Sequence, residues 1–202
     1  MGMFSIICIY DNRKDYNEKL GHSLILLEDC AYELIVKKRV GDYLSNLREA
    51  IEEASNDLIV VINEKVELPS TFLNELKAFE DMSFGVVGVR GRKRESISSG
   101  KAHSVGDEVF LFHKSDYLQF PFDSGYKQHY LIDFAYAMMV QGKENYVMDS
   151  SIEYRHRYRD DPVIISHLRK KYPQFDSIDT MNDFYPVSHI QRVKKLLTRL
   201  VK

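Results

Sequence analysis

Short runs of β-branched, apolar residues alternate with amphipathic segments in this chain, and this alternation constrains the fold more than any other feature. The runs span residues 4–10, 32–36, 58–62 and 84–89. Each is largely apolar, which is typical of strands buried on both faces of a parallel sheet. The sequence therefore predicts an α/β fold with a mostly parallel central sheet flanked by helices.

Apolar residues also recur three or four positions apart between these strands, which predicts three amphipathic helices. They are Tyr16, Leu20, Leu24 and Leu27 in the first segment, Leu44, Leu47, Ile51 and Ala54 in the second, and Phe72, Leu76 and Phe79 in the third. Further along, the pattern predicts a strand at 109–112, a helix at 131–141 and a strand at 145–148. The stretch 90–106, rich in Gly, Ser, Lys and Arg, is interpreted as a long mobile loop.

The chain has 202 residues, with 28 basic and 30 acidic side chains and a net charge of -2. This length predicts one domain, placed at 1–160 and followed by a helical, basic extension at 161–202. The balanced charge gives no electrostatic basis for a nucleic-acid partner. Cys8 and Cys30 lie in no zinc motif, and no apolar run approaches the length of a membrane span, so the sequence predicts a cytoplasmic protein.

Polar residues at the ends of the predicted strands are the first candidates for a functional site, because open α/β sheets bind ligands at the carboxyl ends of their strands. Residues 11–12 follow the first strand, 37–39 the second and 63–67 the third. Neither a GxGxxG nor a GxxxxGK[ST] motif occurs in the sequence. This absence argues against a dinucleotide oxidoreductase and a P-loop NTPase.

The order of the segments resembles that of a family-2 glycosyltransferase of the GT-A fold. The segments that carry the resemblance are 4–20, 32–54, 58–69, 84–90, 105–121 and 130–156. The resemblance implies a single Rossmann-like domain with a helical C-terminal tail. It also implies an enzyme that transfers a sugar from a nucleotide-activated donor.

Such a transfer requires neutralisation of the diphosphate leaving group, usually by Mn²⁺ or Mg²⁺ held by carboxylates. Asn63, Glu64 and Lys65 stand where the family has its DxD metal motif, so a lysine replaces the usual metal-ligating aspartate. Lysine offers no oxygen ligand, so the resemblance predicts that catalysis does not depend on a tightly bound metal. Glu64, Glu67 and His156 are the remaining candidates for a weak metal site.

The same resemblance suggests a catalytic base. Asp133 is the one acid in the stretch 130–134, which is similar to the family's acidic catalytic motif, and it is predicted to deprotonate the acceptor hydroxyl. The alternative is a carboxylate that merely favours a helix N-terminus. His156 is expected to face the diphosphate, with ordinary packing or surface exposure as its alternative.

The nucleotide and its diphosphate are expected to bind at the strand ends. The residues predicted to contact them are Asp11, Asn12, Lys37, Lys38, Asn63, Glu64, Lys65 and His156. For Asp11 and Asn12 the alternative is turn and capping chemistry. For the cations at 37–39 the alternative is a solvated loop, although a strand end favours phosphate binding.

The sequence thus predicts transfer of a sugar from a nucleotide sugar to a glycan or lipid-linked acceptor in surface polysaccharide synthesis. One alternative is a catalytically inactive nucleotide-sugar binder, or a partner subunit of an active glycosyltransferase, which the missing acids favour. A second alternative, a nucleotidyltransferase, would need two clustered acids that the sequence does not show.

The C-terminal residues form a further candidate for binding. Ile190, Val193, Leu197 and Leu200 share one face of a predicted helix whose other faces are basic. This pattern suits the anionic inner face of a membrane, where a lipid-linked acceptor is found. The alternative is that the apolar face docks on its own domain or in a homo-oligomer.

Overall fold

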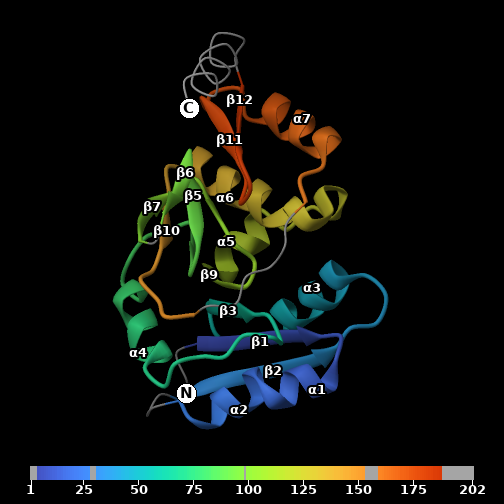
Figure 1. Cartoon of the computed structure of the whole chain (residues 1–202), viewed down its shortest axis with the longest axis vertical. Helices are drawn as coiled ribbons and strands as arrows, with labels where there is room; N and C mark the ends of the chain where they lie inside the picture. The colour runs from blue at the N-terminus through green and yellow to red at the C-terminus, as the bar shows by residue number, and fades with distance from the viewer. Residues whose placement is uncertain (1–3, 28–30, 98, 153–158, 188–202) are drawn as a thin grey trace.

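A computed structural model describes residues 4–27, 31–97, 99–152 and 159–187 (Figure 1). Its main feature is a seven-stranded sheet with the order β2-β1-β3-β9-β4-β10-β7. The strands are β1 (Phe4–Tyr10), β2 (Tyr32–Lys38), β3 (Leu58–Ile62), β4 (Val86–Gly88), β7 (Gly100–Ala102), β9 (Val109–His113) and β10 (Asn145–Val147). The predicted α/β class is confirmed.

Five strands of this sheet run in one direction, and two run against them. β1 is parallel to β2 and β3, and β10 is parallel to β4, whereas β9 is antiparallel to both β3 and β4. β7 is antiparallel to β10 at the far edge. The reversal of β9 has a simple cause: no covering helix intervenes between β4 and β9, so the chain turns back from the carboxyl end of β4.

Helices cover both faces of the sheet. They are α1 (Arg13–Glu18), α2 (Leu20–Ile25), α3 (Tyr43–Glu53), α4 (Phe72–Leu76), α5 (Lys114–Gln119), α6 (Tyr130–Val140) and α7 (Pro162–Lys171), with 3-10 turns η1 (Lys77–Phe79) and η2 (Ser124–His129). Alternate residues of β1 enter two hydrophobic clusters: Ile7 packs with α3 and α6, and Ile6 packs with α2 and α4. β1 is therefore a fully covered central strand.

The stretch 90–106 is not the loop that its composition predicts. It forms β5 (Gly91–Lys93), β6 (Glu95–Ile97) and β8 (Ser104–Val105), which pair in a small antiparallel sheet, together with edge strand β7. Gly91 in this stretch allows close packing, because a Cβ there would lie 2.3 Å from Cγ2 of Val147. The prediction was wrong because short, polar strands at a rim lack the continuous apolar run of a buried strand.

The chain beyond residue 160 contains a hairpin in addition to the predicted helix. α7 begins at Pro162 behind the N-cap Asp161, and β11 (Ser177–Asp179) and β12 (Phe184–Pro186) then pair antiparallel. Apolar residues of α7 and β11 pack against α6 in a third hydrophobic cluster. The predicted basic helix over 190–202 lies outside the described residues.

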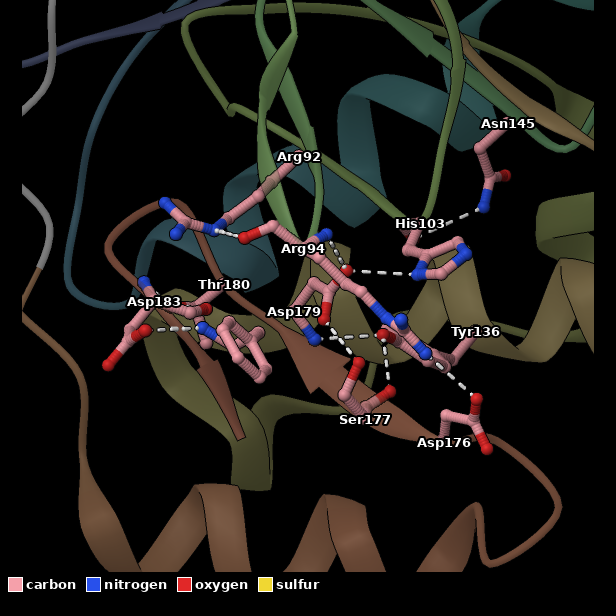
Figure 2. Close-up of polar contacts among 11 residues, drawn as sticks. Arg92, Arg94, His103, Tyr136, Asn145, Asp176, Ser177, Asp179, Thr180 and Asp183 are labelled. Atoms are coloured by element: carbon pink, nitrogen blue, oxygen red, sulfur yellow. Dashed lines mark hydrogen bonds and ion pairs between the residues drawn. The ribbon is translucent and has the colours of Figure 1, made fainter. Parts of the chain in front are cut away.

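A buried polar network joins this hairpin to the small sheet and to α6 (Figure 2). The Asp179 carboxylate, which is fully buried, accepts a 2.6 Å bond from the Arg94 backbone N–H and a 2.7 Å bond from Ser177 Oγ, and it lies 2.9 Å from His103 Nδ1. The Tyr136 hydroxyl accepts from the Asp179 backbone N–H and donates to the Ser177 carbonyl. Burial favours the neutral acid, but these donors outweigh it and lower the pKa of Asp179.

Candidate functional site

The carboxyl ends of β1, β2 and β3 open onto a cavity of about 520 Å³, which we call the strand-end cavity. η2 and the start of α6 form its opposite wall. The lining residues are Ile9, Asp11, Arg39, Gly41, Asp42, Tyr43, Leu44, Asn63, Glu64, Lys65, Asp107, Ser124, Lys127, Gln128 and Tyr130. Its position is the one at which open α/β sheets bind ligands.

Glu64 holds the loop between β1 and α1 in place. Its side chain is buried, and its two carboxylate oxygens accept from the backbone N–H groups of Asp11 at 2.6 Å and Asn12 at 3.4 Å. Asn12 in turn caps α1 by accepting from the Lys14 backbone N–H. Both oxygens of Glu64 thus bind protein donors, and the residue fixes the floor of the cavity.

Three cations reach the cavity from different elements. Arg39 Nε lies 2.8 Å from Asp11 Oδ1, and Lys65 Nζ lies 3.7 Å from Asp15 Oδ2. Both side chains remain nearly half exposed, at 43% and 45%. Lys127, on the opposite wall, has a φ of 47°, a conformation that costs a non-glycine residue free energy and that is concentrated at functional sites.

Two tyrosines belong to the lining, Tyr43, which is partly exposed, and Tyr130, which is almost fully buried. The rings of Tyr43 and Tyr130 lie 6.4 Å apart and are tilted by 41°. Burial raises the pKa of Tyr43, and the nearby Asp107 carboxylate raises it further, so the hydroxyl stays protonated. A planar group can contact the exposed part of Tyr43 while the cations bind an attached anion.

Five of the strand-end candidates line this cavity: Asp11, Arg39, Asn63, Glu64 and Lys65. The others lie elsewhere. Asn12 caps α1, and Lys37 points to α3, where its ammonium lies 3.7 Å from Glu49 and 3.1 Å from Glu53. Lys38 is exposed and Glu67 is also exposed, and neither lines the cavity.

Asp133, the predicted base, faces a different cavity of about 350 Å³. Its carboxylate accepts from Lys171 Nζ at 2.8 Å and 2.9 Å and from the Tyr172 hydroxyl at 2.8 Å. The structure therefore does not bring Asp133 together with the strand-end residues. His156 lies outside the described residues.

Asp107 is a cavity carboxylate that the sequence interpretation missed. It precedes β9, and because β9 is antiparallel, the start of that strand lies at the carboxyl edge of its neighbours. A prediction that assumes parallel strands searches only the residues after each strand. Lys127 was missed for another reason, since η2 has no periodic apolar pattern.

The described residues at the strand ends do not fit a divalent metal. Glu64 has both oxygens bound by backbone N–H groups, Asp11 pairs with Arg39, and Lys65 places a cation beside them. Within the described ranges, no group of three or more His, Cys, Asp or Glu side chains is arranged to hold a metal ion. Mn²⁺ and Mg²⁺ need several free oxygen ligands, so we assign no metal to these residues.

No protein-family model and no curated protein matches this sequence. Among solved structures, residues 1–349 of S. aureus TarS align with a TM-score of 0.57 and 14% identity, covering 85% of this chain and 64% of that one. The same TarS fragment in complex with UDP-GlcNAc gives 0.56 and 11% identity, with 85% and 66% covered.

The mannosyltransferase PcManGT from Pyrobaculum calidifontis, in complex with GDP-Man and Mn²⁺, aligns with a TM-score of 0.57 and 14% identity. The alignment covers 73% of this chain and 54% of that one. The fold is that of the GT-A glycosyltransferases. This chain spans about half to two thirds of the length of these structures. The part that the structure describes has no helix long and apolar enough to cross a bilayer.

Proposed function

We propose that this protein is a glycosyltransferase of the hexosyltransferase type that takes a nucleotide sugar as donor. The observation that carries the proposal is the strand-end cavity, which combines three cations with a partly exposed aromatic side chain, Tyr43, in a GT-A fold. A nucleoside diphosphate has matching chemistry, because it joins a planar base to two anionic phosphates. Structures of the same fold bind GDP-Man and UDP-GlcNAc.

The diphosphate is bound by side chains and not by a metal. Arg39 follows β2 and Lys65 follows β3, the two strands that flank β1, and among the described residues each pairs with one carboxylate, Asp11 or Asp15. An arriving diphosphate carries more negative charge and draws both cations towards it. As the sugar leaves, the same cations stabilise the charge that develops on the leaving phosphate oxygen.

Two carboxylates are candidates for the acceptor base. Asp107 lines the strand-end cavity, whereas Asp133 is bonded to Lys171 and Tyr172 beside another cavity. A base must lie within hydrogen-bond reach of the hydroxyl that it deprotonates. The geometry favours Asp107, and Asp133 is the alternative that direct substitution tests.

The acceptor we propose is a glycan or lipid-linked saccharide used in surface polysaccharide synthesis, at the cytoplasmic face of a membrane. Support for this part comes from the sequence, where the predicted basic amphipathic helix over 190–202 suits an anionic surface. The competing role for that helix is a homo-oligomer contact.

A second function has its own support: a catalytically inactive nucleotide-sugar binder or a partner subunit of an active glycosyltransferase. Glu64, Asp11 and Asp133 are all engaged by protein donors. Such a protein binds the nucleotide sugar in the same cavity but turns over none of it.

A thermal-shift panel of UDP, GDP, CMP and dTDP sugars, in EDTA and with Mn²⁺, tests binding first. A ligand selective for the native state raises stability by about 2.7 kcal/mol at a hundredfold excess over its Kd. We expect one nucleotide to stabilise the protein in EDTA. Lys65→Ala should weaken the affinity for that nucleotide at least ~tenfold, and the matched Lys38→Ala should leave this affinity unchanged.

Turnover then separates the two functions. With the stabilising donor and an acceptor extract, Asp107→Asn abolishes transfer while the Asp133→Asn variant retains it. If neither the wild type nor any variant transfers sugar although the nucleotide binds, the inactive binder is the correct reading. Binding that requires Mn²⁺ contradicts the role given to Lys65.

A further inference from the structure

The far wall of the strand-end cavity is built on a strained segment. η2 supplies three residues of that wall, Ser124, Lys127 and Gln128. Lys127 interrupts the 3-10 turn with a φ of 47° and a ψ of -122°. A non-glycine residue keeps such a conformation only where the surrounding contacts enforce it. The contacts next to Lys127 therefore decide the shape of this wall.

The two residues after Lys127 contact the chain at 159–160. The Gln128 side-chain amide donates to the Arg159 carbonyl, and Nε2 of His129 lies 3.6 Å from Oδ1 of Asp160. Gln128 is exposed, whereas His129 is almost fully buried and the Asp160 side chain is only 12% exposed. Because water screens a buried contact little, the attraction between the imidazole N–H and the carboxylate is stronger than it would be at the surface.

The Asp160 carboxylate is itself fixed by the C-terminal hairpin. Its Oδ2 accepts from the Thr180 hydroxyl at 2.9 Å and from the Tyr185 hydroxyl at 2.8 Å. Thr180 follows β11, and Tyr185 lies in β12. Burial favours the neutral acid, but His129 and the two hydroxyls outweigh it and lower the pKa of Asp160. The carboxylate is therefore ionised at neutral pH and holds a fixed place.

Asp160 also determines how the His129 ring is oriented. The other ring nitrogen, Nδ1, is buried and has no hydrogen-bond partner in the part of the chain that the structure describes. A carboxylate accepts hydrogen bonds but donates none, so Asp160 favours the tautomer that carries its proton on Nε2. Without this carboxylate, no described group would fix the imidazole that ends η2.

We propose that Asp160 is a positioning residue for the strand-end cavity. It holds His129, which fixes the strained backbone at Lys127 and thereby sets where the Lys127 ammonium meets the diphosphate. Asp160 does not line the cavity, so it acts through His129 and η2. The effect on the diphosphate rests on the proposed function, whereas the effect on the backbone does not.

Limited trypsin digestion of the full chain tests the backbone, because cleavage after Lys127 requires η2 to open locally. Asp160→Asn turns a neutral group towards His129, so we expect this cleavage to accelerate at least ~tenfold. Tyr185→Phe removes one donor to Asp160 and should accelerate it less. Cleavage after the exposed Lys38 should change far less, and the matched Asp176→Asn, at an exposed carboxylate before β11, should alter neither rate.

A double-mutant cycle tests the ligand. Calorimetry in EDTA measures the affinities of the wild type, Asp160→Asn, Lys127→Ala and the double variant for UDP and GDP. We expect Asp160→Asn to weaken the affinity at least ~threefold, but to weaken it no further when Lys127 is already alanine. Circular dichroism verifies folding, and if Asp160→Asn does not fold, Tyr185→Phe takes its place in both experiments.

The two experiments separate the failure of this inference from the failure of the proposed function. A wild type that binds neither nucleotide contradicts the proposed function, and the digestion then decides alone whether Asp160 fixes η2. Cleavage after Lys127 that rises no more than cleavage after Lys38 overturns the inference. An affinity that Asp160→Asn leaves unchanged, or lowers equally with and without Lys127, overturns it as well.

Discussion

The strand-end cavity and the Asp179 network both collect carboxylates and cations, but they use them in opposite ways. At the cavity, the Arg39–Asp11 pair is about half exposed on both sides and the Lys65–Asp15 contact is long at 3.7 Å. In the network, the Asp179 carboxylate is fully buried and satisfied by three donors (Figure 2). The charges of the first region remain accessible to a ligand, whereas the carboxylate of the second region binds donors that hold the hairpin, the small sheet and α6 together.

The difference follows from the cost of desolvation. An exposed ion pair contributes about 0–1 kcal/mol, whereas removal of one partner from a buried, bonded pair costs about 3–5 kcal/mol. Substitutions in the network should therefore reduce stability, and substitutions at the cavity should reduce binding.

The largest expected effect is that of Asp179→Ala. It leaves the Arg94 N–H and Ser177 Oγ without their acceptor in a buried site, so we expect a loss of about 3–5 kcal/mol in the free energy of unfolding. Urea denaturation measures it. Asp176→Ala, which removes an exposed partner of Arg94, is the control and should change stability far less. Equal losses in both variants would mean that burial of the Asp179 carboxylate does not set the size of its contribution to stability.

Acid should also reduce the stability that the Asp179 carboxylate contributes, by less than the Asp179→Ala substitution does. The folded-state pKa of Asp179 is lowered, so its contribution is fully present above the unfolded pKa of about 3.9 and is lost as pH falls through the folded pKa. Unfolding free energies measured from neutral pH down into this range should fall less steeply in Asp179→Asn than in the wild type. Parallel curves would show that other carboxylates govern the acid transition.

Glu64→Gln should have an intermediate effect on stability. Glu64 is buried like Asp179, but it lines the cavity like Arg39 and Lys65. The amide keeps one oxygen for the Asp11 N–H but turns a donor towards the Asn12 N–H, which predicts a loss of about 1–2 kcal/mol and weaker nucleotide binding. Glu67→Gln, on the exposed neighbour, is the control. Unchanged binding in Glu64→Gln would mean that the loop it holds is not part of the site.

The sequence allowed prediction of the central sheet because β1 and β3 are continuous apolar runs, and of Asp11, Asn63, Glu64 and Lys65 because they directly follow those strands. It did not reveal the direction of β9, and so it missed Asp107. The Asp179 network could not be predicted from the sequence either, because its members lie between residues 94 and 179 and only the folded chain brings them together. The direction of a side chain could not be predicted either: Lys37 lies at a strand end, but its side chain faces α3 and not the cavity.

The smallest stability change is expected for Arg39→Gln, and it is the most informative about the cavity. Because the Arg39–Asp11 pair is exposed, its removal should cost within about 1 kcal/mol. Nucleotide binding should nevertheless fall at least ~tenfold, because the variant loses a charged donor to phosphate and leaves Asp11 unpaired beside it. Lys101→Gln removes a comparable exposed contact with Glu144 at the β7 edge and should leave binding unchanged. If Arg39→Gln binds nucleotide like the wild type, the phosphate lies on the Lys127 wall instead, and Lys127→Gln becomes the variant that must lose it.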